Sequence, residues 1–345
     1  MVQVPVVGRG GVGSGAGAVA LNVTAVGARA GGFVTVWPCG EAMPDASNLN
    51  FAAGQTIANF VVSKVGAGGR VCVFTSAATD LLIDVVGMFN GGDTYRALSP
   101  ARLADSRDGG STIDGRLAGF GVVEASSVVQ VPVVGRGGVG SGAGAVALNV
   151  TAVGARADGF VTVWPCGEAM PDASNLNFAA GQTIANFVVS KVGDGGRVCV
   201  FTSAATDLLV DVVGVFDDDD AYRAFSPARL IDSRSDSADP AGRSGAAGIR
   251  AANSTTAVHV TGSAGVRPGT AAVTLNVTAV GARADGFVTV WPCGEAMPDA
   301  SNLNFAAGQT IANSVVSKVG DGGRVCVFTS AATDLLVDIA GAFRP

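Results

Sequence analysis

The sequence predicts an all-β protein made of three tandem antiparallel β-sandwich domains, jelly-roll-like, with one disulfide each. Apolar and polar residues alternate with a period of two in short segments, and glycine, which makes up 50 of the 345 residues, separates these segments. The same block of sequence also occurs three times. About seven or eight short strands per repeat, with a turn every 8 to 12 residues, favour a sandwich or jelly roll over a closed barrel.

The first strong strand signal lies near the start of the chain. Leu21 and Val23 alternate there with Asn22 and Thr24, which is the pattern of a half-buried strand. Segments rich in glycine or containing proline separate the strands, and no stretch has the spacing of an amphipathic helix. Further strands are predicted at residues 33–37, 48–51, 59–65, 70–75 and 81–89.

The repeat has a fixed period. The motif V-T-V-W-P-C-G places its cysteine at Cys39, Cys166 and Cys293, at intervals of 127 residues. Residues 1–89 differ from residues 128–216 at five positions, which indicates recent duplication. The predicted domains are repeat 1 (residues 1–90), repeat 2 (residues 91–217) and repeat 3 (residues 218–345).

Repeats 2 and 3 open with a motif that we call the SPARL segment, after the residues at its centre. It reads Y-R-A-L-S-P-A-R-L-A-D-S-R at residues 95–107 and Y-R-A-F-S-P-A-R-L-I-D-S-R at residues 222–234, whereas residues 1–90 contain no such motif. The chain is therefore interpreted as a part of a longer array of repeats, or as a subunit whose first domain lacks this segment. The acidic run at residues 217–220 is predicted to be a solvated linker.

The cysteines fall two to a repeat, always 33 residues apart. Because one pair per domain without nearby histidine supplies too few soft ligands for a metal, a disulfide within each repeat is the simpler interpretation. Such a bridge contributes about 3–4 kcal/mol by restricting the unfolded chain. Disulfides imply an oxidising compartment, so a secreted or cell-surface protein is predicted. The predicted pairs are Cys39 with Cys72, Cys166 with Cys199, and Cys293 with Cys326.

Composition argues against several classes of function. The net charge is -6 and no basic cluster occurs, which disfavours binding to nucleic acids or anionic membranes. His259 is the only histidine, so histidine-based catalysis and histidine metal sites are disfavoured as well. No apolar run reaches the length of a membrane span. We therefore expect no cofactor, no metal, no membrane span and no enzymatic activity.

An aspartate interrupts the last apolar strand of each repeat. Because a bare buried carboxylate costs several kcal/mol, it needs a partner, and the SPARL segment supplies arginines. We predict that this segment docks on the sandwich and that its arginine pairs with this aspartate or with the aspartate of D-S-R. Asp80 and Asp84 are also considered as a catalytic pair, but the sequence near them does not indicate an acid with a raised pKa beside a partner. The residues of this predicted ion-pair site are Asp84, Asp211, Asp338, Arg102, Arg107, Arg229 and Arg234, with Asp105 and Asp232 as the alternative acids.

Asp84 has no SPARL segment within its own repeat. It is therefore expected to be exposed, or to meet the SPARL segment of the following repeat or of another subunit. A segment delivered by another subunit would be strand addition, which builds head-to-tail filaments.

A second site hypothesis is a glycan site. Trp37 is available for stacking on a sugar ring, and Asn48, Asn50 and Gln55 offer amide groups for hydroxyls. The structural interpretation is the stronger one, because amides near turns usually satisfy local backbone groups and a tryptophan beside a disulfide usually packs on it.

Five ordered blocks resemble a repeat domain that is widespread in secreted and cell-surface proteins of actinobacteria. They are S-P-A-R-L-x-D-S-R, L-N-V-T-A-V, G-F-V-T-V-W-P-C-G, S-N-L-N-F-A-A-G-Q-T-I-A-N and D-V-V-G-x-F. The family pattern usually has threonine at Ser106 and tyrosine at Met88. The resemblance covers nearly the whole chain, implies bacterial export and a non-catalytic stalk, adhesion or binding role, and leaves the ligand open.

The sequence thus predicts a non-enzymatic extracellular structural repeat protein. It would serve as a cell-surface stalk or adhesin, or as a head-to-tail filament subunit joined by a donated SPARL segment. The predicted partners are further copies of the chain or a cell-surface component. The alternative is an array of carbohydrate-binding modules with a glycan partner.

Overall fold

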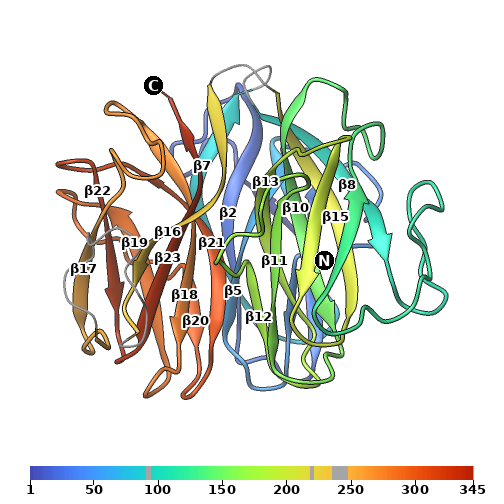
Figure 1. Ribbon diagram of the computed structural model, residues 1–345. Helices are drawn as coiled ribbons and strands as arrows, with labels where there is room; N and C mark the ends of the chain where they lie inside the picture. The colour runs from blue at the N-terminus through green and yellow to red at the C-terminus, as the bar shows by residue number, and fades with distance from the viewer. Residues whose placement is uncertain (91–94, 218–220, 235–247, 345) are drawn as a thin grey trace.

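The computed structural model describes residues 1–90, 95–217, 221–234 and 248–344. The predicted all-β class is confirmed, because the described residues form 23 strands and no helix. Each repeat consists of two packed antiparallel sheets (Figure 1). The central part of the predicted acidic linker, residues 218–220, lies outside the described residues.

Repeat 1 shows the basic sandwich. We call its two layers the outer sheet, in the strand order β1-β6-β3-β4, and the inner sheet, in the order β5-β2-β7. The outer sheet contains β1 (Val2–Pro5), β3 (Gly32–Pro38), β4 (Leu49–Phe51) and β6 (Arg70–Thr75), and the inner sheet contains β2 (Ala16–Val26), β5 (Ile57–Lys64) and β7 (Asp80–Asn90).

Repeats 2 and 3 have the same two layers, with one more strand in each inner sheet. That strand is formed by the SPARL segment, which pairs antiparallel with the last strand of its own repeat. In repeat 2 the inner sheet contains β13 (Ile184–Lys191), β10 (Ala143–Val153), β15 (Asp207–Asp217) and the SPARL strand β8 (Tyr95–Asp105), and the outer sheet contains β12 (Leu176–Phe178), β11 (Gly159–Pro165), β14 (Arg197–Thr202) and β9 (Ser127–Pro132). In repeat 3 the inner sheet contains the SPARL strand β16 (Tyr222–Asp232), β23 (Asp334–Phe343), β18 (Ala272–Val280) and β21 (Ile311–Lys318), and the outer sheet contains β17 (Ser254–His259), β22 (Arg324–Thr329), β19 (Gly286–Pro292) and β20 (Leu303–Phe305).

The strand β2, for which the sequence predicts one buried face, is buried on both faces. Leu21 and Val23 of β2 point into the core between the two sheets, as the alternation predicts. The opposite face carries Ala18 and Ala20, which pack in a second apolar cluster formed by all three repeats. The prediction of a solvated face is wrong because this face meets the neighbouring repeats.

The three repeats form a closed ring in which each repeat contacts both others. The Asn149 side chain donates a hydrogen bond of 2.7 Å to the Ser47 carbonyl of repeat 1, and Asn276 donates in the same way, at 2.7 Å, to Ser174 of repeat 2. The third bond of this set, 2.6 Å long, runs from Asn22 to the Ser301 carbonyl of repeat 3. These last residues stand 279 positions apart in sequence, so the contact closes the ring.

The strands β5, β13 and β21 meet at the centre of the ring (Figure 1). The rings of Phe60 and Phe187 pack edge to face there, with centroids 5.0 Å apart. Repeat 3 has Ser314 at the equivalent position, and its hydroxyl donates a hydrogen bond to the carbonyl of Phe187. The centre of the molecule is therefore a tightly packed part of the core.

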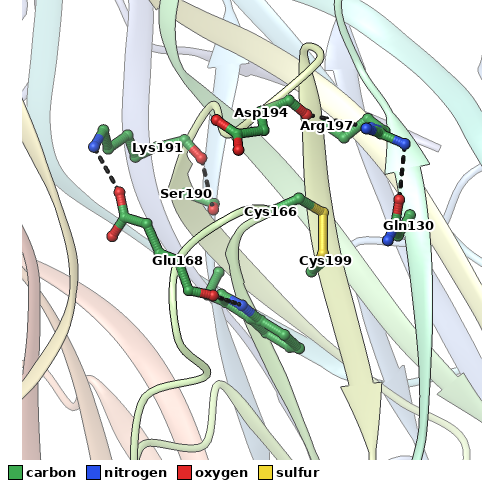
Figure 2. Close-up of a disulfide and its surroundings, with 9 residues drawn as sticks. Gln130, Cys166, Glu168, Ser190, Lys191, Asp194, Arg197 and Cys199 are labelled. Atoms are coloured by element: carbon green, nitrogen blue, oxygen red, sulfur yellow. Dashed lines mark hydrogen bonds and ion pairs between the residues drawn. A yellow bond between two sulfur atoms is a disulfide. The ribbon is translucent and has the colours of Figure 1, made fainter.

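A disulfide lies in the outer sheet of each repeat. The bonds join Cys39 with Cys72, Cys166 with Cys199, and Cys293 with Cys326. Figure 2 shows the second of them beside the Lys191–Glu168 ion pair. Gly193 is required beside this bond, because a Cβ there would overlap the backbone of Cys166. Three disulfides indicate that the protein folds in an oxidising environment.

Candidate functional site

The SPARL segment of repeat 2 is fixed by a buried arginine. Arg102 donates from Nε to the Asp211 carboxylate at 2.5 Å and from Nη2 to its second oxygen at 3.3 Å. Its Nη1 reaches Asp105 at 2.8 Å, and Arg107 reaches the same carboxylate at 2.7 Å. The SPARL segment of repeat 3 repeats this network, with Arg229 joined to Asp338 at 2.5 Å and to Asp232 at 2.8 Å.

Burial and charge have opposing effects on these groups. Burial raises the pKa of Asp211 to about 6, against the attraction of Arg102. Although burial alone would lower it, the pKa of Arg102 is raised overall by the two carboxylates that face it. The pKa of Asp105 is lowered, because Arg107 and Arg102 outweigh the effect of burial. At neutral pH the network is therefore ionised, and its geometry is bidentate.

Each SPARL segment also touches the preceding repeat, so it joins two repeats. Arg102 donates from Nη2 to the Asp45 carbonyl of repeat 1 at 2.7 Å, and Ser99 hydrogen-bonds the carboxylate of Glu41. In repeat 3 the equivalent bonds run from Arg229 to the Asp172 carbonyl, at 3.0 Å, and from Ser226 to Glu168.

The tyrosine that opens each SPARL segment belongs to an aromatic cluster, which we call the aromatic crown. Tyr95 packs between Phe89 and Phe216, with centroid distances of 4.6 and 4.8 Å. Tyr222 packs between Phe216 and Phe343 in the same way, at 4.1 and 4.6 Å. Phe343 and Phe89 complete the circle at 5.9 Å, without a tyrosine between them in the described chain.

A glycine makes room for each of these tyrosines. A Cβ at Gly214 would overlap the Tyr95 hydroxyl, and a Cβ at Gly341 would overlap the Tyr222 hydroxyl. Gly87 is the equivalent residue of repeat 1, where the nearest atom to such a Cβ is the Ala20 methyl at 4.0 Å. Sequence reasoning missed this part of the site, although the tyrosine and the G-x-F motif recur with the repeat.

Repeat 1 differs from the other two at the edge of its inner sheet. No described strand pairs with the free edge of β7, and no arginine or lysine of the described residues pairs with Asp84. Burial and the nearby charge of Asp299 raise the pKa of Asp84. Leu82 is 54% exposed and Met88 is 39% exposed, whereas the equivalents of Leu82 in the other repeats, Leu209 and Leu336, are each 5% exposed. This edge is therefore an apolar strand that is interrupted by the carboxylate of Asp84.

The residues predicted for a glycan site mostly serve the fold. Trp37 is buried against the disulfide and donates from Nε1 to the Glu41 carbonyl at 3.1 Å. Asn48 accepts a hydrogen bond from the backbone of β3, and Gln55 accepts one from the turn at Ala52. Asn50 lines a cleft that has a volume of about 330 Å³ and lies between repeats 1 and 2.

The candidate catalytic acids Asp80 and Asp84 both lie on the strand β7. Asp80 does not join Asp84 in an acidic pair, because the two are separated along one edge strand. In the described part of the chain no three histidine, cysteine or acidic residues gather as metal ligands. Among the same residues, no helix is long and apolar enough to cross a membrane.

Comparisons with known proteins identify no family. No family model matches the chain, and neither does any curated protein. One similar solved structure is an archaeal virus protein with a triple jelly roll fold and turret assembly; it is 7% identical, the match covers 99% of this chain and 83% of that one, and the TM-score is 0.22. A structure from the Sulfolobus turreted icosahedral virus is 8% identical over 98% of this chain and 82% of that one, with a TM-score of 0.20. Both similarities are remote.

Proposed function

We propose that the chain is a non-enzymatic extracellular structural protein, a building block of a cell-surface stalk, adhesin or filament of the actinobacterial repeat type. The observation that carries this proposal is the closed ring. Residues common to the repeats, such as Asn22 and Asn149, join one repeat to the next, and the arginines of the SPARL segments join repeats as well as strands. The motif residues are thus engaged in holding the molecule together.

The distribution of charge and the disulfides support the same proposal. The buried carboxylates are held by arginines in ion pairs, which is a structural use of acidic groups. One disulfide per repeat suits a protein that works outside the cell, where reducing systems are absent. In this proposal the unit of assembly is the three-repeat ring, and further copies attach to its exposed edges.

Analytical ultracentrifugation and electron microscopy of the whole chain test this proposal. We expect oligomers whose size rises with protein concentration and which appear as uniform chains of rings. A protein that stays monomeric up to about 100 μM and shows no assembly by microscopy would contradict the proposal.

A second candidate is carbohydrate binding at the junctions between repeats. It is favoured by two equivalent clefts of about 330 Å³, one lined by Asn50 and Arg107 and the other by Asn177 and Arg234. A glycan array tests it, with the variant Asn50→Ala combined with Asn177→Ala as the control. Binding that this double variant abolishes would favour this candidate, and the absence of any bound glycan would reject it.

A further inference from the structure

We propose that the free edge of β7 is a strand-acceptor site that takes a SPARL-type strand from another polypeptide chain. The strand would carry a tyrosine followed by the S-P-A-R-L-x-D-S-R core. This inference rests on the proposed structural function, because it names the contact through which further copies or partners attach. Two filled copies of the same site within this molecule show what such a strand would contact.

The filled sites define the register of the incoming strand. In repeat 2 the SPARL strand pairs antiparallel with β15 and places Tyr95 opposite Phe216 and Arg102 opposite Asp211. Repeat 3 keeps both pairs, with Tyr222 opposite Phe343 and Arg229 opposite Asp338. The equivalents of the acceptor residues in repeat 1 are Phe89 and Asp84, and β7 is paired on its other side with β2. The free edge of β7 thus offers the same sequence of backbone and side-chain partners.

The apolar part of the acceptor is already shaped for the strand. Gly87 keeps the space that a SPARL tyrosine takes in the other repeats, between Phe89 and Phe343 of the aromatic crown. Gly11 also leaves open space, because no atom lies within 4 Å of the position that a Cβ would take there. At Gly138, the equivalent residue of repeat 2, Leu98 of the SPARL strand β8 lies 3.0 Å from that position. Apolar side chains of the same strand, such as Leu82, are exposed. An unpaired edge with such side chains favours strand addition.

Charge complementarity selects a SPARL strand over other strands. Asp299 of repeat 3 lies near enough to repel the charge of Asp84, and no arginine or lysine of the described residues pairs with Asp84, so the site has an excess of negative charge. An arginine of the incoming strand would neutralise it, as Arg102 does in the bidentate pair with Asp211 and at the Asp45 carbonyl. A second copy of β7 contains no arginine or lysine, so a β7–β7 pair would supply no cation for Asp84. The structure therefore favours a SPARL strand over a symmetric edge-to-edge dimer.

The closed ring also provides a way to fill the site deliberately. Tyr95 stands six residues after Phe89, and Tyr222 stands six residues after Phe216. In the ring, the repeat that follows repeat 3 is repeat 1, as the Asn22 to Ser301 bond shows. A SPARL segment fused so that its tyrosine stands six residues after Phe343 should therefore reach β7 of its own chain and block the site.

The test is the binding of a synthetic peptide with the sequence of residues 222–234, Y-R-A-F-S-P-A-R-L-I-D-S-R, to the whole chain. Calorimetry should show one peptide per chain, and hydrogen exchange should slow at the amides of β7. A peptide with alanine at the position of Arg229 should bind at least tenfold more weakly, while alanine at the position of the exposed Arg223 should leave binding within about threefold. The chain with the fused SPARL segment should bind no peptide.

Protein variants provide matched controls on the acceptor side. Gly87→Ala should abolish binding without unfolding the chain, because its Cβ meets only the Ala20 methyl at 4.0 Å. Met88→Val, which introduces the residue found at the equivalent position Val215, should leave binding intact. The proposal is overturned if the peptide fails to bind at 1 mM, if Gly87→Ala binds as the parent chain does, or if protection falls outside β7.

The failure of this inference is distinguishable from the failure of the proposed function. Oligomers that form while the peptide does not bind would overturn the acceptor site and leave the structural function standing. Peptide binding by a chain that otherwise stays monomeric and binds glycans would support the acceptor and overturn the structural function.

Discussion

Replacing Arg102 with alanine should destabilise the protein strongly, because this side chain neutralises two buried carboxylates at once. The Arg102 side chain is 9% exposed, and the side chains of Asp211 and Asp105 are each 1% exposed. Removing one partner of a buried ion pair costs about 3–5 kcal/mol, since the remaining charge stays out of water. We therefore expect Arg102→Ala to lower the free energy of unfolding by about 3–5 kcal/mol at pH 7.

Urea unfolding followed by circular dichroism measures this loss, and hydrogen exchange shows whether β8 detaches first. Arg107→Ala is the matched control, because its side chain is 44% exposed and its ion-pair partner Asp105 keeps Arg102. It should cost less than about 1 kcal/mol. Equal losses for the two variants, or a loss below about 1 kcal/mol for Arg102→Ala, would refute the assignment of Arg102 as the central contact of the SPARL segment.

Three further predictions concern the centre of the ring, the tyrosine pocket and acid stability. Phe187→Ala, which opens a cavity at the axis, should lower the free energy of unfolding by about 3–5 kcal/mol in the same urea assay. Gly214→Ala should lower the melting temperature by calorimetry because its Cβ overlaps the Tyr95 hydroxyl, whereas Gly87→Ala should leave it unchanged; equal shifts would contradict the pocket. The hydrogen bonds from Arg136 lower the pKa of Asp114 to about 2, so the stability from this pair is complete above about pH 4 and is lost as the pH falls toward 2. Asp114→Asn should therefore destabilise the chain more at pH 6 than at pH 2, where the carboxylate is about half protonated, and a cost that is the same at both pH values would contradict this ion pair.

The sequence is informative about elements formed by local patterns. The segments 33–37 and 70–75 lie within β3 and β6, because alternation and flanking glycines act over a few residues. The aspartate in an apolar strand also points to the arginines of the SPARL segment, since a buried carboxylate needs a cation wherever it lies. The sequence predicts strand addition only for a SPARL segment from another subunit. The pairing of this segment with the last strand of its own repeat is not predicted, because its motif contains proline and charged residues.

The closed ring is beyond what the sequence alone allows one to predict. Ala18 and Ala20 are compatible with either a solvated face or a packed one, and only the packing of three repeats decides between them. Because the repeats are nearly identical, the sequence does not show whether two motifs meet within one repeat or between two repeats. Trp37 and Gln55 are residue types that can bind a sugar. The turns around them decide their roles instead, because they bury Trp37 and give Gln55 a local hydrogen bond.

Small-angle X-ray scattering of the monomeric fraction, separated by size exclusion at low concentration, tests the central claim that the three repeats form one closed body. A compact chain of 345 residues has a radius of gyration of about 20 Å. We predict this value for the ring that the Asn22 to Ser301 contact closes. A radius above about 30 Å, the value for three separate domains strung along a line, would contradict the closed ring and with it the strand-acceptor site.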